Sequence, residues 1–197
     1  MSQPYYGLKA LSQDTAIFVA PDGLDAGWAN TNGRDVSFID DVLAQVEADL
    51  CVDTERVFAT GLSYGGAMTY ALACARPEIY RAVAVMSGGS LSGGCNGTPG
   101  PVAYLGIHGV SDTTLSISGA RALRDTFVAA NGCTPQDAPE PAVGSDTHIV
   151  TAYSGCREGY PVVWAAFDGG HIFPMPIDAG QTTSWVPAEI WNFLAQF

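Results

Sequence analysis

The sequence predicts an α/β fold in which helices cover both faces of a mostly parallel β-sheet. Short apolar runs, most of them ended by a turn that contains glycine, are typical of buried strands. These runs alternate with segments in which apolar residues recur every three or four positions, the spacing of an amphipathic helix. Of the 197 residues, 47% are hydrophobic and only 14% are charged. We therefore expect residues 1–197 to form a single domain around a compact core.

The first half of the chain alternates predicted strands and helices. The apolar run 15–23 ends in a Pro-Asp-Gly turn signal and is the first predicted strand. A helix begins near Asp35, its expected N-cap, because apolar residues follow at helical spacing: Ile39, Val42, Leu43, Val46 and Leu50. Strand 56–60, helix 64–76 and strand 80–88 come next. This order is that of two parallel strands joined by a helical crossover.

The second half repeats the alternation after a loop rich in glycine and serine. The predicted strands are 101–109, 148–153 and 161–169, and the predicted helices are 117–131 and a last one near 185–197. Gly132 stands where it would cap the first of these helices. Strands that are apolar throughout are buried on both faces, which is typical of parallel sheets with helices on either side.

The charge of the chain disfavours several classes of partner. The chain has twenty acidic and eight basic residues, which give a net charge of -12. Such a surface repels nucleic-acid phosphates and anionic lipids, so we expect no nucleic-acid partner, no membrane partner and a neutral substrate. No apolar run approaches the length of a membrane span.

The five cysteines favour a secreted protein with disulfides. No Cys-x-x-Cys or His-x-x-x-His spacing occurs, which argues against a zinc site. Spacing alone leaves open all three ways of pairing any four of the cysteines. Asn96-Gly97-Thr98 matches the N-glycosylation sequence, which points the same way. We expect a secreted glycoprotein, although residues 1–15 lack the basic start and apolar core of a signal peptide.

One pentapeptide predicts a nucleophilic serine. Gly61-Leu62-Ser63-Tyr64-Gly65 follows a predicted strand and opens a predicted helix, the context that the Gly-x-Ser-x-Gly elbow requires. The turn is tight, so we expect larger side chains at Gly61 and Gly65 to clash. The serine stands at a helix N-terminus, where the backbone N–H of Tyr64 can stabilise an oxyanion.

A serine needs a base to take its proton and a carboxylate to orient that base. Asp112 follows the strand 101–109, and His171 follows the strand 161–169, so serine, acid and base come in the order of this architecture. Asp168 is the rival acid, but it more plausibly completes the turn of its own strand. The rival bases are His108, expected to brace the acid loop, and His148, which opens a strand. This chemistry needs neither a metal nor a cofactor.

Several longer stretches carry a family resemblance. They are "APDGLDAGWAN", "DVSFIDDVLAQVEADLCVDTERVFATGLSYGGAMTYALACARPEIYRAVAVMSGG", "GIHGVSD", and "NGCTP" together with "YSGC". The chain resembles the secreted feruloyl esterases of fungal type, over nearly all of its length. These esterases belong to a wider α/β-hydrolase group with polyhydroxybutyrate depolymerases and acetylxylan esterases.

The resemblance implies hydrolysis of hydroxycinnamate esters on plant cell-wall polysaccharide. It assigns Ser63 as nucleophile, Asp112 as acid and His171 as base. It also implies two disulfides, Cys51–Cys74 and Cys133–Cys156, with the partner of Cys95 in a segment upstream of this chain. The alternative interpretations are an acetylxylan or polyhydroxybutyrate-type esterase, and an impaired fragment that binds carbohydrate.

The chain departs from the family pattern at its beginning. Nothing in residues 1–15 resembles the family's first strands or its His-x-x-Gly-Gly loop, which supplies a second N–H to the oxyanion. We therefore expect a domain that is incomplete at its N-terminus, or a sheet that closes by pairing strand 15–23 directly with strand 56–60. Loss of one oxyanion donor lowers turnover by about a hundredfold to a thousandfold, so we expect impaired activity.

Overall fold

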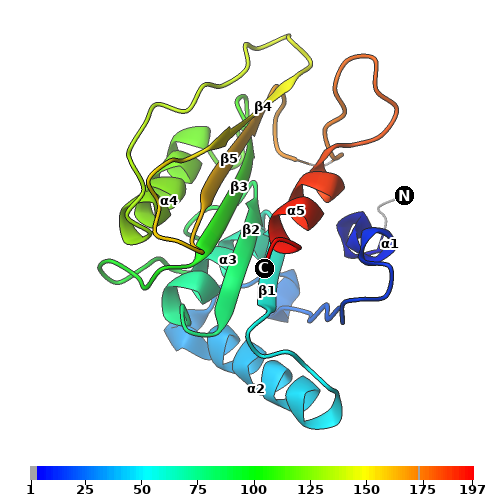
Figure 1. Cartoon of the computed structure of the whole chain (residues 1–197), viewed down its shortest axis with the longest axis vertical. Helices are drawn as coiled ribbons and strands as arrows, with labels where there is room; N and C mark the ends of the chain where they lie inside the picture. The colour runs from blue at the N-terminus through cyan, green and yellow to red at the C-terminus, as the bar shows by residue number, and fades with distance from the viewer. Residues whose placement is uncertain (1–3, 173) are drawn as a thin grey trace.

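A five-stranded sheet forms the centre of the computed structural model, which describes residues 4–172 and 174–197. The strand order is β1-β2-β3-β5-β4 (Figure 1). Four strands run parallel, and β4 pairs with β5 in the antiparallel direction. The strands are β1 Val57–Leu62, β2 Tyr80–Met86, β3 Ala103–Gly109, β4 His148–Ala152 and β5 Val162–Phe167. The predicted mostly parallel α/β sheet is confirmed.

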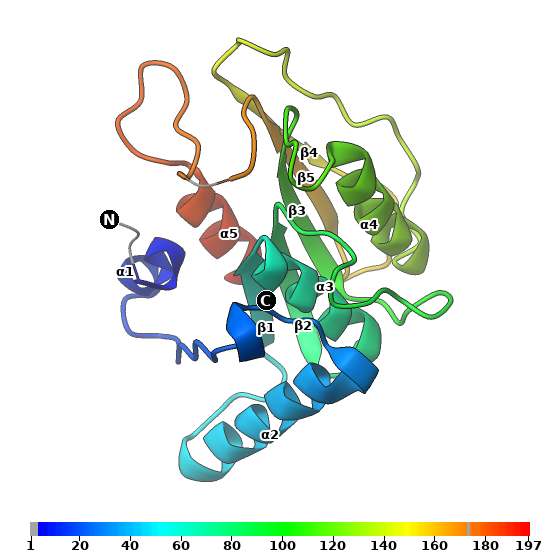
Figure 2. The ribbon, with the colours of Figure 1, turned by 180° about the vertical axis from the view of Figure 1, so that it is seen from behind.

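Helices cover both faces of the sheet (Figures 1 and 2). The first face carries α2 Arg34–Asp49, α3 Tyr64–Ala75 and α4 Ile117–Ala130, and the second carries α1 Leu8–Ser12 and α5 Val186–Leu194. Along β2, Val83 and Val85 pack into the first core, while Ala84 and Met86 pack into the second. Because side chains alternate between the faces of a strand and both faces are covered, every position from Ala82 to Met86 is apolar.

The helix ends agree in part with the sequence. Ser116 caps α4 by accepting the N–H of Gly119, and Gly132, with a φ of 69°, follows the helix as expected. Asp35 is not the N-cap of α2, because the helix already begins at Arg34. Instead the Asn30 side chain accepts the N–H groups of Asp35 and Val36, each at 3.1 Å.

The predicted strand 15–23 is wrong. This segment pairs with no strand in the described part of the chain, and Ile17 and Val19 are each about half exposed. A strand needs a neighbour for its backbone hydrogen bonds, and β1 bonds only to β2 among the described residues. The sheet therefore does not close by pairing this segment with β1. The sequence also failed to indicate α1 and three short 3-10 helices: Pro4–Gly7, Leu24–Ala26 and Thr31–Gly33.

The disulfides differ from the expected set. The structure joins Cys133 to Cys156, the pairing that the resemblance implied. The expected pair Cys51–Cys74 is wrong, since Cys74 is joined to Cys95 and Cys51 is an exposed free thiol. Cys74 lies on α3 and packs against the first core together with Cys95, whereas Cys51 follows α2 outside that core. The disulfide thus ties the loop after β2 to α3, the helix that follows Ser63.

Candidate active site

The three predicted catalytic residues each follow a parallel strand. Ser63 comes directly after β1, Asp112 follows β3 and His171 follows β5. Because these strands run in the same direction within one sheet, their carboxyl ends meet at the same edge. The topology therefore brings residues from distant parts of the chain to one edge of the sheet.

Ser63 occupies a strained turn between β1 and α3. Its φ of 56° and ψ of -115° lie outside the regions that side-chain-bearing residues prefer. The Ser63 N–H donates to the carbonyl of Met86 at 2.9 Å, and its own carbonyl accepts the N–H of Ala67 at 2.9 Å. These two bonds hold the turn against the end of β2 and the first turn of α3.

The glycines around Ser63 differ in whether they leave room for a side chain. A Cβ on Gly61 would collide with the backbone of Gly65, so the predicted requirement for glycine holds there. A Cβ on Gly65 would meet open space, so the expected clash at that position is wrong. The second steric requirement lies one residue later, because a Cβ on Gly66 would come within 2.7 Å of the Met86 carbonyl oxygen.

Asp112 and His171 form a hydrogen-bonded pair. The His171 Nδ1 lies 2.8 Å from Asp112 Oδ2, and the side chain of Asp112 has no exposed surface. The other carboxylate oxygen accepts the N–H groups of Thr114 at 2.8 Å and Leu115 at 2.9 Å. Burial acts to raise the pKa of Asp112, but the Leu115 N–H, the His171 ring and the Thr114 N–H outweigh it and lower the pKa. The acid is therefore ionised at neutral pH.

His171 presents its second nitrogen away from the acid. Its side chain is 25% exposed, and Asp112 engages Nδ1, so Nε2 is the nitrogen left to act as a base. The backbone N–H of the next residue, Ile172, donates to Ser87 Oγ at 3.3 Å. The hydrogen bonds of the described residues do not include one between the Ser63 hydroxyl and the His171 ring. The structure thus bonds Asp112 to His171 directly, and the end of β2 links the Ser63 turn to the residue after His171.

His108 contacts the acid from behind. Its Nε2 lies 2.7 Å from the Leu115 carbonyl and 3.3 Å from Asp112 Oδ2. Both partners are acceptors, so Nε2 carries the proton. The ring is buried, stacks on Trp164 with centroids 6.4 Å apart, and burial lowers its pKa despite the Leu115 carbonyl and Asp112. His108 thus supports the loop that carries Asp112, as the sequence suggested.

The rival acid and the remaining rival base are engaged elsewhere. Asp168 accepts the N–H of Asp146 at 2.8 Å, so its side chain bonds the loop before β4 rather than the turn of its own strand. His148 bonds Asp178 through Nδ1 at 2.6 Å and stacks on Trp185 with centroids 3.9 Å apart. Neither residue contacts Asp112 or His171 by a hydrogen bond within the described ranges.

Tyr64 begins α3, so its backbone N–H has no carbonyl partner within the helix. That N–H and the partial positive charge of the helix N-terminus both favour a negative oxygen next to Ser63. The Tyr64 ring packs over Gly27, where an added Cβ would come within 2.7 Å of Cε1. The loop that precedes α2 therefore fixes the residue whose N–H would meet the oxyanion.

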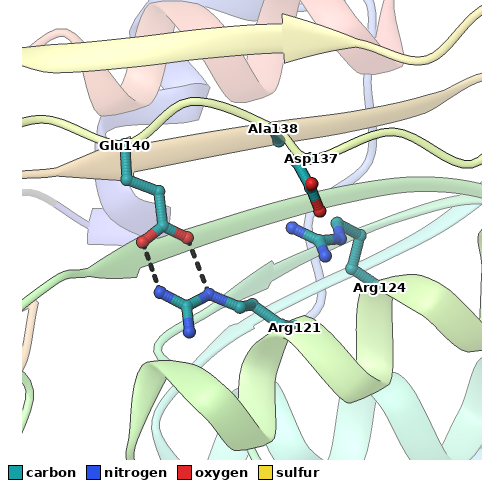
Figure 3. Close-up of a pocket in the computed structure, with 5 residues that line it drawn as sticks. All are labelled: Arg121, Arg124, Asp137, Ala138 and Glu140. Atoms are coloured by element: carbon teal, nitrogen blue, oxygen red, sulfur yellow. Dashed lines mark hydrogen bonds and ion pairs between the residues drawn. The ribbon is translucent and has the colours of Figure 1, made fainter.

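A separate hollow of about 370 Å³ lies beside α4 (Figure 3). Arg121 reaches across it to Glu140 with two hydrogen bonds, and Arg124, Asp137 and Ala138 complete its lining. None of the three predicted catalytic residues lines this hollow, and its ion pair fastens the loop after α4 to that helix. Across residues 4–172 and 174–197 we find no cluster of three or more metal-ligating side chains. In the same ranges no helix has the length and apolarity to cross a membrane.

Comparison with known proteins identifies the family. The chain is 54% identical over 191 residues to feruloyl esterase C of Emericella nidulans, a match that covers 97% of this chain and 68% of that protein. The chain belongs to the feruloyl esterase family. A probable feruloyl esterase C of Aspergillus niger is 50% identical, with the same coverage of both chains. The expected resemblance is thereby confirmed.

Two further matches place this feruloyl esterase family member in a wider fold group. The prolyl oligopeptidase family model matches residues 24–90, the segment that contains the serine turn. An acetyl xylan esterase from Aspergillus awamori has a similar structure, with a TM-score of 0.58 and 17% identity, over 82% of this chain and 67% of that one. At this level of identity the likeness establishes the shared fold.

Sequence reasoning missed one residue of the candidate site. Ser87, directly after β2, is completely buried and accepts the N–H that follows His171. The available signal was its place in "MSGG", at the carboxyl end of a strand between those of the serine and the acid. A serine among glycines in a loop is common, so the sequence did not single it out.

Proposed function

We propose that the chain hydrolyses hydroxycinnamate esters of plant cell-wall polysaccharide by acyl transfer through Ser63, His171 and Asp112. The observation that carries the proposal is the 2.8 Å hydrogen bond between His171 and the buried Asp112, at the sheet edge where Ser63 sits in its strained turn. A buried ionised carboxylate on a histidine is the arrangement that prepares a neutral imidazole to accept a proton. The names of the relatives supply the substrate class.

The reaction proceeds in two halves. His171 Nε2 takes the proton of Ser63, Oγ attacks the ester carbonyl carbon, and the tetrahedral intermediate collapses as His171 returns the proton to the leaving alcohol. Water then gives a proton to His171 and attacks the acyl-serine, which releases the carboxylic acid and restores the hydroxyl. Asp112 holds the imidazole tautomer and stabilises the imidazolium that forms in each half. The Tyr64 N–H stabilises the oxyanion.

Charge and covalent chemistry support an extracellular site of action. The net charge of -12 suits a neutral ester and disfavours nucleic acid and anionic membranes. The two disulfides belong in an oxidising compartment. Asn96 lies on an exposed turn with Gly97 at a φ of 83°, so the glycosylation sequence is accessible. We propose a secreted, single-domain glycoprotein.

A fluorophosphonate probe tests the nucleophile. The folded wild-type chain should be labelled, and Ser63→Ala should lose both labelling and methyl ferulate hydrolysis, the latter by up to about a millionfold. Ser37→Ala is the matched control, because Ser37 is an exposed serine on α2, outside the segments that follow β1, β3 and β5. It should retain both signals.

The outcomes separate the proposal from its alternatives. A folded wild-type chain that takes no label contradicts the serine mechanism and favours a carbohydrate-binding role. A labelled chain that prefers acetate or hydroxybutyrate esters to methyl ferulate retains the mechanism and overturns the hydroxycinnamate substrate.

A further inference from the structure

Ser87 has an unusual backbone conformation for a serine. Its φ is 40°, in the left-handed region that favours glycine, and the residue has no exposed surface. The next residue, Gly88, is a glycine at a position where neighbouring atoms leave no room for a Cβ. This segment therefore has glycine where close packing requires it, yet has serine at position 87. A strained, buried, side-chain-bearing residue at a site edge points to a role for the side chain.

The backbone around Ser87 joins three parts of the site. The carbonyl of Met86 accepts the Ser63 N–H at 2.9 Å, and the Ser87 N–H donates to the Ile107 carbonyl of β3 at 2.8 Å. The strand β3 leads to Asp112. Ser87 therefore sits where the serine turn and the strand of the acid are both fixed by backbone hydrogen bonds.

The Ser87 side chain reaches the third part, the turn that carries the base. Its Oγ accepts the N–H of Ile172 at 3.3 Å, and Ile172 is buried. Among the described residues, 170–172 have only one other hydrogen bond, that between the His171 ring and Asp112. Within the described ranges, the Ser87 hydroxyl thus accepts the hydrogen bond that ties the backbone of this turn to the end of β2.

We propose that Ser87 is a positioning residue for the esterase reaction. This inference rests on the proposed function above. Its hydroxyl fixes the position of the turn 170–172 relative to Ser63. Nε2 of His171 can then come within hydrogen-bonding distance of the Ser63 hydroxyl. The Asp112 contact fixes the ring at Nδ1, and the Ser87 contact fixes the backbone on which the ring is mounted. Together they leave the imidazole little freedom to swing away from the nucleophile.

Two variants separate the hydroxyl from the backbone strain. Ser87→Ala removes the hydroxyl, and Ser87→Gly removes it while relieving the positive φ, so the glycine variant should fold at least as well as the alanine variant. Both should lower kcat for methyl ferulate by about tenfold to a hundredfold, with KM within about twofold of wild type. Ser12→Ala is the control, because Ser12 is a buried serine on α1 whose hydroxyl bonds the Lys9 carbonyl. It should keep the wild-type kcat.

A spectroscopic readout makes the result independent of turnover. The low-field proton NMR signal of His171 Nδ1–H should exchange faster with water in Ser87→Ala and Ser87→Gly than in Ser12→Ala. If Ser87→Gly matches wild type in kcat and in this exchange while the wild-type chain takes the fluorophosphonate label, the inference about Ser87 is overturned and the proposed function stands. If the folded wild-type chain takes no label, both fail.

Discussion

Asp112 is a buried carboxylate surrounded by hydrogen-bond donors. Two backbone N–H groups bond one oxygen, and His171 and His108 approach the other. The Leu115 N–H, the His171 ring and the Thr114 N–H favour the charged form, which explains why the pKa of Asp112 falls in spite of burial. Because the carboxylate is fixed from several sides, it can hold the His171 ring in one orientation.

His108 should make the stability of the protein depend on pH. Burial lowers its pKa from the ordinary value of 6.5, so as the pH falls below about 6.5 the unfolded chain takes up a proton that the folded chain does not. The free energy of unfolding should therefore fall with decreasing pH, by at most about 1.4 kcal/mol per pH unit from this group. Urea unfolding at several pH values measures the slope.

Two variants of His108 provide the test. His108→Gln keeps a side-chain N–H for the Leu115 carbonyl and Asp112 but cannot titrate, so it should fold well and lose this component of the slope. His108→Leu leaves the Leu115 carbonyl without that donor and should be less stable by about 1 to 3 kcal/mol at neutral pH. An unchanged slope in His108→Gln would show that other groups cause the pH dependence.

At the scale of the element, β1, the serine turn and α3 behave as one unit. Gly61 and Gly66 keep the strand, the helix and the end of β2 in close contact, and Ser63 takes the strained conformation between them. Packing excludes a side chain at Gly66 but not at Gly65, although the sequence has glycine at both positions.

The two neighbouring glycines should therefore respond differently to alanine. Gly65→Ala adds a Cβ in open space within the first turn of α3 and should raise stability slightly, by up to about 1 kcal/mol. Gly66→Ala places a Cβ against the Met86 carbonyl and should lower stability by about 1 to 3 kcal/mol. Thermal unfolding of both variants distinguishes them. Equal destabilisation would mean that the turn is packed differently.

On the scale of the whole molecule, two cores on opposite faces of one sheet hold the strand ends in place. The sequence predicted this architecture because the apolar runs and helical spacings are local signals that packing reinforces. The strands from 56 onward, α2 to α5, and the positions of Ser63, Asp112 and His171 relative to their strands all follow from such signals.

The remaining features depend on contacts between distant residues. Residues 15–23 have a strand-like composition, yet a strand also needs a partner, and none lies beside them in the described structure. Cysteine pairing depends on which side chains meet, so Cys74 joins Cys95 rather than Cys51. The hydrogen bond from Ile172 to Ser87 spans 85 residues and leaves no local trace in the sequence.

A crystal structure of the phosphonylated protein would test the convergence of serine, base and acid most directly. We expect phosphorus bonded to Ser63 Oγ, a phosphoryl oxygen within hydrogen-bonding distance of the Tyr64 N–H, and His171 Nε2 beside the adduct while Nδ1 stays on Asp112. Phosphorus on another residue, or a His171 ring turned away from the adduct, would contradict the account.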